Sequence, residues 1–345
     1  MTVVYILENV PLSAYSTMRL GGNALFLTEV SSKQEVVQAI EWAESRQLPA
    51  ILIGSGSNIV WQDSGYPGLV IVNKLLGISK TGELDNVTYM TAGSGVIWDD
   101  FVDHIVQLGL SGIEQLSLIP GTVGATPVQN VGAYGREISD VLTTLEAFDL
   151  KTHTFVTIKA SECQLGYRTS RFKTVDKGRF FITSVTYFLT NEKPIPPYYN
   201  AVEDYFKEHS ITDINALELR KAVIAIRKQK LPDPMIHPNN GSFFANPIIT
   251  SNEFFALRAY FPDIHYWSVD NEHMKLSAAW LIEQVGFKNY HDEETGMAVW
   301  PDQSLVLVNE KAESTASLLK FKQKIIDAVK EKFGILLEQE PELLP

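Results

Sequence analysis

Hydrophobic positions recur along the first half of the chain with two different periods. Residues 36, 37, 40 and 43 are apolar at helical spacing, and they follow Ser32 and Glu35, which are spaced as in a capping box. Short aliphatic runs at 49–53, 68–72 and 87–91 are typical of strands. A second amphipathic helix is predicted over 97–108, before Gly109. We therefore expect strands and helices to alternate in this half.

The periodic pattern disappears between residues 116 and 140. This stretch reads LSLIPGTVGATPVQNVGAYGREISD, which is rich in glycine and poor in charge. Loops of this length without secondary structure are uncommon in compact domains and are usually functional. The alternative is a long buried connection. Strands are expected to resume at 145–150 and 179–189.

A domain boundary is predicted within residues 191–197, where three prolines in a polar setting fix extended backbone. Beyond it, the pattern predicts helices over 216–230, 276–285 and 312–332, with a strand over 305–308. We expect one domain over residues 1–192, made of two subdomains split near residue 73, and a second α+β domain over 193–345.

Composition excludes several classes of protein. The net charge of −12 and the scattered Lys and Arg residues argue against nucleic-acid binding. The single cysteine, Cys163, permits neither an intramolecular disulfide nor a Cys-based metal site, and we expect it to be a small buried hydrophobe. The chain begins without a signal-peptide pattern and has no apolar run of about 18–20 residues. A soluble, cytoplasmic monomer without a metal is expected.

Two glycine-dense segments are the first candidates for ligand binding. Residues 54–58, GSGSN, follow a predicted strand, and bare backbone N–H groups there could approach a phosphate. The segment lacks the third glycine of a Rossmann fingerprint and the lysine of a P-loop. Residues 121–135 form the second cluster. Two distant glycine loops suit a long ligand such as a dinucleotide, whereas the alternative is close packing of turns.

Three further stretches carry reactive or charged side chains. Tyr167 and Arg168 precede Ser170 and Arg171, Ser242 stands between a glycine and two phenylalanines, and the tail 337–342 reads LEQEPE. Taken singly, each has an ordinary interpretation: a surface arginine, a turn serine and a solvated acidic tail. Ser242 does not lie in a Gly-x-Ser-x-Gly elbow, so the sequence does not support nucleophilic hydrolysis.

In combination and in this order, these stretches resemble one known family. The pieces STMRLGGN, LIGSGSN, IPGTVGATPVQNVGAYG, YRTSRFK, KLPDP and NGSFFANP resemble the UDP-N-acetylenolpyruvoylglucosamine reductases, the MurB family of peptidoglycan synthesis. The likeness extends over nearly the whole chain. It implies an α+β fold, with an FAD-binding region of the vanillyl-alcohol-oxidase/PCMH type in residues 1–192. A smaller α+β substrate-binding domain would follow in 193–345, with the tyrosine loop of type I members and a tail that returns to the active site.

The resemblance also implies a reaction. NADPH would reduce noncovalently bound FAD, which would then reduce the enolpyruvyl group of UDP-N-acetylglucosamine enolpyruvate to give UDP-N-acetylmuramate. Arg168 and Glu338 match the residues that stabilise the enolate, and Ser242 matches the proton donor. The family tail commonly reads Leu-Glu-Pro-Glu-Val, whereas this tail doubles the acidic pattern, so Glu340 is a rival. Glu338 is preferred here because it keeps the distance from Ser242 without a gap.

The same resemblance assigns binding residues. The expected FAD contacts are Gly54, Ser55, Gly56, Ser57, Asn58, Gly121, Gly124, Ala125, Gln129, Asn130, Gly132, Ala133 and Tyr134. The expected UDP-sugar contacts are Tyr199, Lys230, Asn246 and Lys275, and Lys230 could either bind the diphosphate or polarise the serine.

Two other classes of protein are alternatives to the reductase. A flavin oxidase of the same superfamily would commonly tether its flavin through His or Cys, and neither glycine loop contains one. A nucleotide-sugar-binding regulator would be expected to have lost the arginine, the serine or the tail glutamate.

Overall fold

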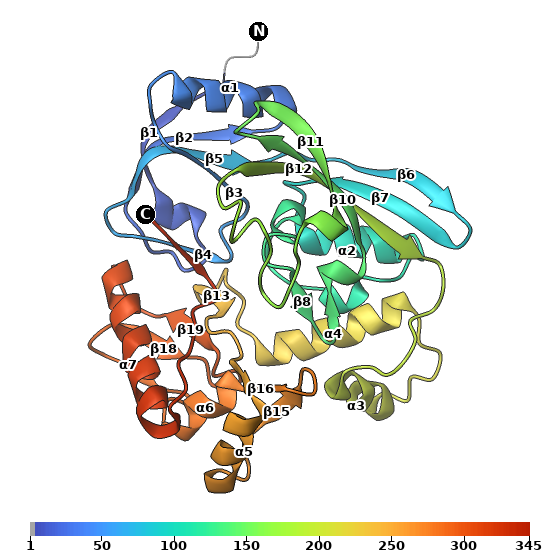
Figure 1. Cartoon of the computed structure of the whole chain (residues 1–345), viewed down its shortest axis with the longest axis vertical. Helices are drawn as coiled ribbons and strands as arrows, with labels where there is room; N and C mark the ends of the chain where they lie inside the picture. Colours follow the sequence, from blue (N-terminus) through green and yellow to red (C-terminus); the bar gives the residue numbers. More distant parts are fainter. Residues whose placement is uncertain (1–3) are drawn as a thin grey trace. The chain divides into compact units, whose positions relative to one another are not determined.

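The computed structural model of the chain describes residues 4–345, which form two compact units (Figure 1). Unit 1 contains the chain up to Val10, Ala24–Ser55 and Pro67–Gln229. Unit 2 contains Pro11–Asn23, Gly56–Tyr66 and Lys230–Pro345. In the second half of the chain, the boundary between the two units lies between residues 229 and 230. The domain boundary expected between residues 192 and 193 stays a prediction.

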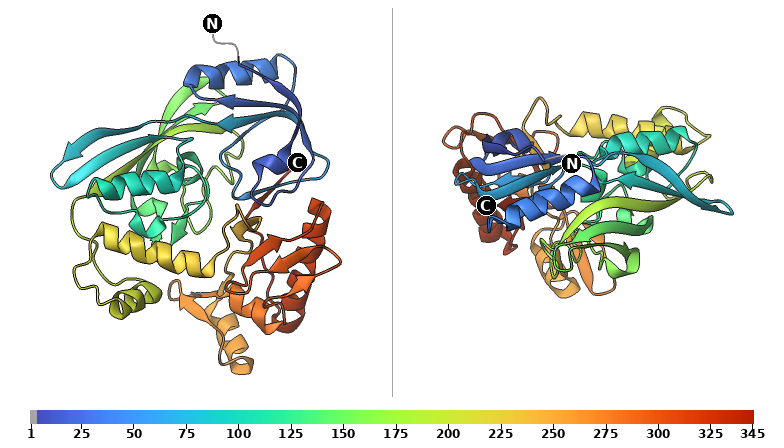
Figure 2. Two further views of the ribbon diagram at one scale, coloured as in Figure 1. Left: turned by 180° about the vertical axis from the view of Figure 1, so that it is seen from behind. Right: turned by 90° about the horizontal axis from the view of Figure 1, so that it is seen from above.

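The first sheet of unit 1 lies under one helix. Its strand order is β1 (Leu7–Pro11), β2 (Asn23–Val30), β5 (Tyr66–Asn73) and β3 (Ala50–Ile53). Helix α1 (Lys33–Glu44) lies on one side of this sheet (Figure 2). Its N-terminal cap is Ser32, whose side chain accepts the N–H of Glu35. Val36 and Ile40 of this helix are buried against Leu69. The predicted helix and the strand at 68–72 are therefore confirmed.

The second sheet of unit 1 is antiparallel throughout. Its order is β11 (Thr154–Lys159), β10 (Leu142–Asp149), β12 (Phe180–Thr190), β7 (Val87–Gly93) and β6 (Ile78–Leu84). Helix α2 (Trp98–Gln107) packs beside it, with Trp98 and Phe101 each in ring contact with Tyr187. This confirms the predicted second helix and the strands at 87–91, 145–150 and 179–189.

Two helices end unit 1. They are α3 (Asn200–Glu208), which the sequence pattern did not predict, and α4 (Ala216–Lys230), which has the predicted bounds. Tyr198 and Phe206 pack with Leu219 and Val223 in a core of their own. Between α2 and β10 runs the glycine-rich segment. It contains only the short 3-10 turns η2 (Glu114–Leu116), η3 (Val123–Ala125) and η4 (Ile138–Asp140) and the two-residue strands β8 (Gly132–Ala133) and β9 (Arg136–Glu137), as expected for a loop.

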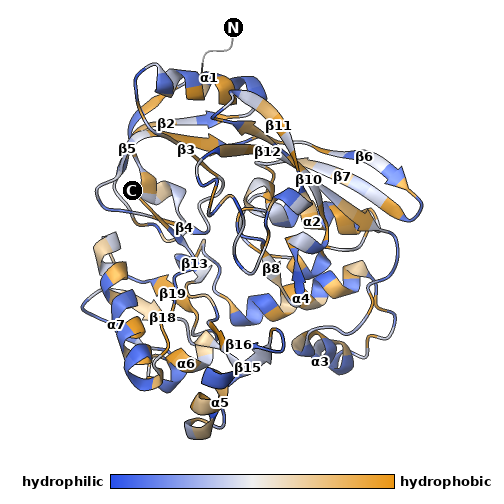
Figure 3. Cartoon of the chain, viewed as in Figure 1, coloured by the Kyte–Doolittle hydropathy of each residue, from blue (hydrophilic) through white to orange (hydrophobic). Residues whose placement is uncertain are grey.

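Unit 2 is built on two small sheets and three helices. One sheet has the order β13 (Asn239–Ser242), β19 (Val306–Asn309), β18 (Met297–Val299) and β17 (His291–Asp292), and the other β14 (Ile248–Thr250), β16 (His273–Leu276) and β15 (Tyr266–Ser268). The helices are α5 (Ser251–Tyr260), α6 (Ala278–Gln284) and α7 (Thr315–Phe333). Helix α7 carries both apolar and polar residues (Figure 3). Its apolar residues Leu318, Phe321 and Ile325 are buried in the core.

Two early segments of the chain complete unit 2. Strand β4 (Ile59–Trp61) pairs in parallel with β20 (Glu342–Leu344) at the end of the chain. The carboxylate of Asp63 accepts the N–H groups of Thr315 and Ala316 in the first turn of α7, where a negative charge is favourable. The helices in the described part of the chain are all too short or too polar to cross a lipid bilayer.

Candidate functional site

The structure brings the start of the first glycine loop against the second glycine loop. Both segments belong to unit 1. A Cβ atom on Gly54 would lie 2.5 Å from Oγ1 of Thr122, and one on Gly124 would lie 2.5 Å from Cβ of Ser94. A side chain at 54 would collide with Thr122 of the second loop, and one at 124 would collide with Ser94. Glycine at 54 therefore allows the two loops to pack closely, and glycine at 124 allows the second loop to pack on Ser94.

The rest of the first glycine loop is held by unit 2. Gly56 has a φ of +74°, and a Cβ there would lie 2.1 Å from the carbonyl oxygen of Tyr15. Its own carbonyl accepts the N–H of Thr17. The carbonyl of Ser57 accepts the side-chain amide of Asn240 at 3.1 Å. Residues 56–58 are thus fixed by backbone and amide contacts from two other segments.

Asn130 organises the second glycine loop from within. It is buried and has a φ of 48°. Its amide nitrogen donates to the carboxylate of Glu137 at 2.8 Å and to the carbonyl of Gly166 at 3.2 Å. Its oxygen accepts the N–H of Ser139 at 2.9 Å. Both ends of the side-chain amide are therefore engaged in shaping the loop, and its predicted contact with FAD stays a prediction.

Arg168 is docked on the second glycine loop. It stands at the tip of a tight turn in which Gly166 and Thr169 exchange backbone hydrogen bonds, and its φ is 55°. Its guanidinium donates to the carbonyl of Gly132 at 2.7 Å. The predicted catalytic arginine and the predicted FAD loop are therefore neighbours in unit 1.

An arginine that the sequence pattern did not single out lies beside Tyr134, which in turn contacts Tyr199. The rings of Tyr134 and Tyr199 meet edge to face, with centroids 5.5 Å apart. Arg227 on α4 hydrogen-bonds to Tyr134, and its Nε donates to the carbonyl of Leu118 at 3.3 Å. Burial lowers the pKa of the Arg227 guanidinium and raises the pKa of the Tyr134 hydroxyl.

A signal for Arg227 was present in the sequence. Arg220 and Arg227 are seven residues apart on a predicted helix and therefore share one face. Leu219 and Val223 of the same helix are buried. An arginine that lies among the buried residues of a helix needs a polar partner, because burying an unpaired charge is costly.

The remaining predicted site residues gather in unit 2. Ser242 ends β13 and follows Gly241, which has a φ of 69°. The side-chain oxygen of Asn246 accepts the N–H of Ala278 at the start of α6. Lys275 lies on β16, with its ammonium 5.7 Å from the ring centre of Trp267. Lys230 is exposed at the end of α4.

The acidic tail runs antiparallel to the segment that follows Ser242. The N–H of Glu340 donates to the carbonyl of Phe243 at 2.9 Å, and the N–H of Ala245 donates to the carbonyl of Glu338 at 2.9 Å. Glu340 therefore lies opposite Phe243, the residue next to Ser242. Glu338 lies opposite Ala245, three residues after Ser242. Glu338 is exposed, and Glu340 is half-buried.

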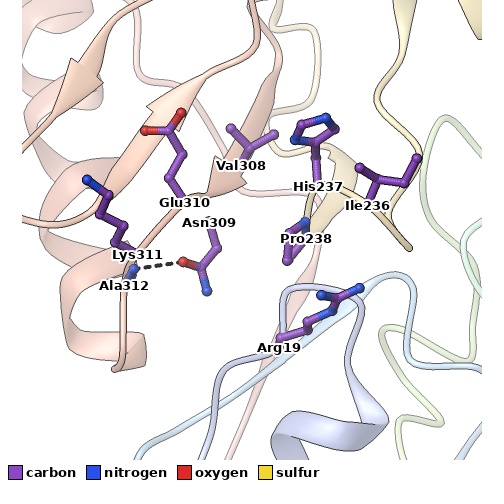
Figure 4. Close-up of a pocket in the computed structure, with 9 residues that line it drawn as sticks. All are labelled: Arg19, Ile236, His237, Pro238, Val308, Asn309, Glu310, Lys311 and Ala312. Atoms are coloured by element: carbon purple, nitrogen blue, oxygen red, sulfur yellow. Dashed lines mark hydrogen bonds between the residues drawn. The ribbon is translucent and has the colours of Figure 1, made fainter.

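A separate cavity of about 510 Å³ lies in unit 2, beside β19 (Figure 4). Its lining includes Arg19, His237 and Lys311. Arg19 donates to the carbonyls of Pro234 and Met235, so this cation is already engaged. Among the described residues that line the cavity, none is a predicted site residue.

Comparison with known proteins identifies the family. The chain is 36% identical over 338 residues to the UDP-N-acetylenolpyruvoylglucosamine reductase of Xanthomonas axonopodis pv. citri (strain 306), covering 98% of this chain and 95% of that protein. It is also 36% identical over 337 residues to the reductase of the same name from Amoebophilus asiaticus (strain 5a2), covering 98% of each. The chain belongs to the UDP-N-acetylenolpyruvoylglucosamine reductase family.

Domain and structural comparisons agree with membership of this reductase family. Residues 233–344 match the family model "UDP-N-acetylenolpyruvoylglucosamine reductase, C-terminal domain", and residues 24–158 match "FAD binding domain". The fold is similar to that of the reductase from Thermus caldophilus, with a TM-score of 0.67 at 24% identity, covering 99% of this chain and 100% of that one. The predicted family and fold class are confirmed.

The matched ranges contain most of the predicted site. Both glycine loops fall within the FAD-binding range, and Ser242, Asn246, Lys275, Glu338 and Glu340 fall within the C-terminal domain of the reductase family. Arg168, Tyr199 and Lys230 lie between the two ranges. The roles of the individual residues stay predictions.

Proposed function

We propose that this protein reduces UDP-N-acetylglucosamine enolpyruvate to UDP-N-acetylmuramate in peptidoglycan precursor synthesis, with noncovalent FAD and with NADPH as reductant. The observation that carries this proposal is the identity of 36% with UDP-N-acetylenolpyruvoylglucosamine reductases over nearly the full length of the chain. We place the enzyme in the cytoplasm as a monomer, with the UDP-sugar as its partner.

The glycine loops fit the FAD that the family requires. Gly54 lets the first loop pack on Thr122 of the second, Gly124 packs on Ser94, and Gly121 and Gly135 have φ values of 143° and 82°. Backbone of this kind can surround a long, flat cofactor and its phosphates. Bound FAD supplies two-electron chemistry that no side chain can perform. Neither loop contains a His or Cys that could tether the flavin.

Arg168 and Ser242 would act on the substrate itself. As the enolpyruvyl group is reduced, negative charge develops on its carboxylate as an enolate. The guanidinium of Arg168, anchored on the carbonyl of Gly132, would stabilise that charge because arginine stays protonated. The hydroxyl of Ser242 would then give its proton to carbon. A serine hydroxyl is a weak acid, so the strong basicity of the carbon must drive this transfer.

We further propose that Glu340, rather than Glu338, is the carboxyl group that assists the enolate. The register of the tail favours it, because the backbone of Glu340 bonds to the residue next to Ser242. Its partial burial also favours it, since an electrostatic contact with substrate is stronger where water is excluded. A protonated carboxyl group could donate a hydrogen bond to the enolate.

Five cationic or polar side chains would bind the UDP-sugar. Tyr199 and Arg227, which both contact Tyr134, would contact the diphosphate. Asn246 lies two residues before β14, and Lys275 lies on its partner strand β16. Lys230 would bind the diphosphate or polarise Ser242. These cations are needed locally because the net charge of −12 repels an anionic substrate.

Stopped-flow measurements on the purified holoenzyme test this function. The protein should be yellow, acid should release all its flavin, NADPH should bleach the flavin, and the enolpyruvyl substrate should restore the colour. In Ser242→Ala, bleaching should be unchanged, while turnover should fall by roughly 10²–10⁴-fold because a positioned general acid is lost. A colourless protein, or recolouring by oxygen but not by the enolpyruvyl sugar, would refute the reductase assignment. Normal turnover in Ser242→Ala would refute only the role of the serine.

A further inference from the structure

Leu118, three residues before the second glycine loop, is held in an unfavourable backbone conformation. Its φ is 57°, in the left-handed region, where the Cβ of an ordinary residue crowds the following carbonyl oxygen. Such a conformation persists only where the surroundings impose it, and it is then a reason to look for a function.

Both polar groups of Leu118 are bound by charged side chains. Its N–H donates to the carboxylate of Asp99 at 2.5 Å, and its carbonyl accepts Nε of Arg227 at 3.3 Å. Asp99 belongs to the first turn of α2, and Arg227 belongs to α4. A single residue in a strained conformation therefore connects a carboxylate on one helix with a half-buried arginine on another.

A second arginine fixes the carboxylate. Both terminal nitrogens of Arg220 donate to Asp99, at 2.6 and 3.1 Å, in the forked geometry that arginine favours. Arg220 is only 7% exposed. It lies two helical turns before Arg227 on the same face of α4. The contacts therefore run from Arg220 on α4 to Asp99, from Asp99 to Leu118, and from Leu118 back to Arg227 on α4.

We propose that Asp99 is a positioning residue for substrate binding. It holds the peptide of Leu118 so that the carbonyl orients the guanidinium of Arg227, and Arg220 holds Asp99 in place. The inference rests on the proposed role of Arg227 in binding the UDP-sugar. A long arginine side chain would otherwise sample many rotamers, and fixing it beforehand removes that entropy loss from the binding step.

A simpler role for this ion pair would be to join α2 to α4. Asp103, one helical turn after Asp99, distinguishes the two roles. Its carboxylate also accepts a hydrogen bond from Arg220, at 3.1 Å, and its side chain is 50% exposed. In the described part of the chain, the side chains that hydrogen-bond to Leu118 are those of Asp99 and Arg227, and Asp103 is not one of them. Asp103→Asn is therefore a matched control that weakens the helix contact and leaves the Leu118 peptide held.

The test compares steady-state constants of the flavin-loaded variants. Asp99→Asn keeps the size of the side chain and loses its charge. We expect it to raise KM for the enolpyruvyl sugar by on the order of tenfold, the effect of a small misplacement of a binding group. The kcat and the bleaching of the flavin by NADPH should change by less than about twofold. Arg220→Lys, which keeps the charge but loses the fork, should give a smaller rise in KM, and Asp103→Asn should give none.

Combining substitutions shows whether Asp99 acts through Arg227. Arg227→Gln alone should raise KM at least as much as Asp99→Asn, and the two together should be no worse than Arg227→Gln. If Arg227→Gln leaves KM unchanged, the proposed role of Arg227 fails. If it raises KM but Asp99→Asn does not, or the two effects multiply, or Asp103→Asn matches Asp99→Asn, the positioning inference fails. If Asp99→Asn does not retain flavin, Arg220→Lys makes the same comparison.

Discussion

At the scale of single residues, left-handed backbone in residues other than glycine recurs at the candidate site, as it does at eight positions elsewhere in the described residues. Leu118, Asn130, Tyr134 and Arg168 all have φ between 48° and 57°, and they lie just before the second glycine loop, within it or in contact with it. Such conformations cost about 1–2 kcal/mol each for most side chains. Asn130 is the one residue of the four that tolerates the region readily. The sequence could not predict the other three, because their identities favour ordinary backbone.

The choice between the two tail glutamates is decided by a pair of matched substitutions. Glu340→Gln should lower kcat by about 10²–10³-fold, the usual effect of losing one group that stabilises developing charge, and should leave flavin reduction by NADPH intact. Glu338→Gln should remain within about twofold of the parent, because Glu338 is exposed and lies further along the register. Single-turnover oxidation of the reduced enzyme by substrate measures both. The reverse ranking would restore Glu338 to the site.

At the scale of elements, long periodic segments could be predicted and short ones could not. Helix α4 has the bounds that the pattern predicts, and α1 begins at its capping box. Helix α7 begins at Thr315 rather than at residue 312, because the side chain of Ser314 caps it by accepting the N–H of Ser317. The three strands of the sheet β14–β16–β15 have only three or four residues each, too few to show a period of two.

The serine-bearing strand shows why the site itself needed the structure. Strand β13 reads Asn-Asn-Gly-Ser, which has no strand propensity, and it forms because Ser242 pairs with Val306 and Asn239 with Val308 on β19. The resemblance supplied the residue types of the site. The register of Glu340 against Phe243, like the contact between Arg168 and Gly132, depends on pairings between distant segments that local patterns do not specify.

An ion pair between two strand ends predicts how stability depends on pH. Asp149 ends β10 and is buried, and Arg179, just before β12, donates to both its carboxylate oxygens, at 3.0 and 2.7 Å. These hydrogen bonds lower the pKa of Asp149 to about 2 from an ordinary value of 3.8. A carboxyl group whose pKa is lower in the folded state stabilises the protein above its unfolded pKa. That stabilisation is lost as the pH falls from about 4 to about 2.

Asp149→Asn should therefore lower the free energy of unfolding by about 2 kcal/mol at pH 7, and the difference from the parent should shrink towards zero near pH 2. Urea unfolding followed by circular dichroism at several pH values measures this. Glu294→Gln is the control, because Glu294 pairs with Lys320 and Lys324 at an exposed site where solvent screens the charges. A constant difference across the pH range would show that Asp149 contributes by packing rather than by charge.

At the scale of the whole molecule, the order of the two family domains could be predicted and the composition of the compact units could not. Residues 11–23 and 56–66 belong to unit 2, although they are separated from its main part by more than 160 residues of sequence. Local hydrophobic patterns did not predict β4, and they could not show that its partner is β20 at the end of the chain. Membership of a sheet is a long-range property, and here it joins residues 59–61 to the last strand of the chain.

This interleaving predicts that residues 230–345 do not fold alone. The core of unit 2 includes Met18, Leu20 and Val60, each at most 2% exposed. Burial of such side chains contributes about 1.5–3 kcal/mol apiece, so their loss removes roughly 5–9 kcal/mol, comparable with the whole stability of a typical domain. Strand β20 would also lose β4. The isolated fragment should show no cooperative urea transition and should be digested rapidly by protease. Co-expression with residues 1–229, which supply both missing segments, should restore a resistant complex. Cooperative unfolding of the fragment by itself would contradict the prediction. It would mean that residues 11–23 and 56–66 pack on a core that is stable without them.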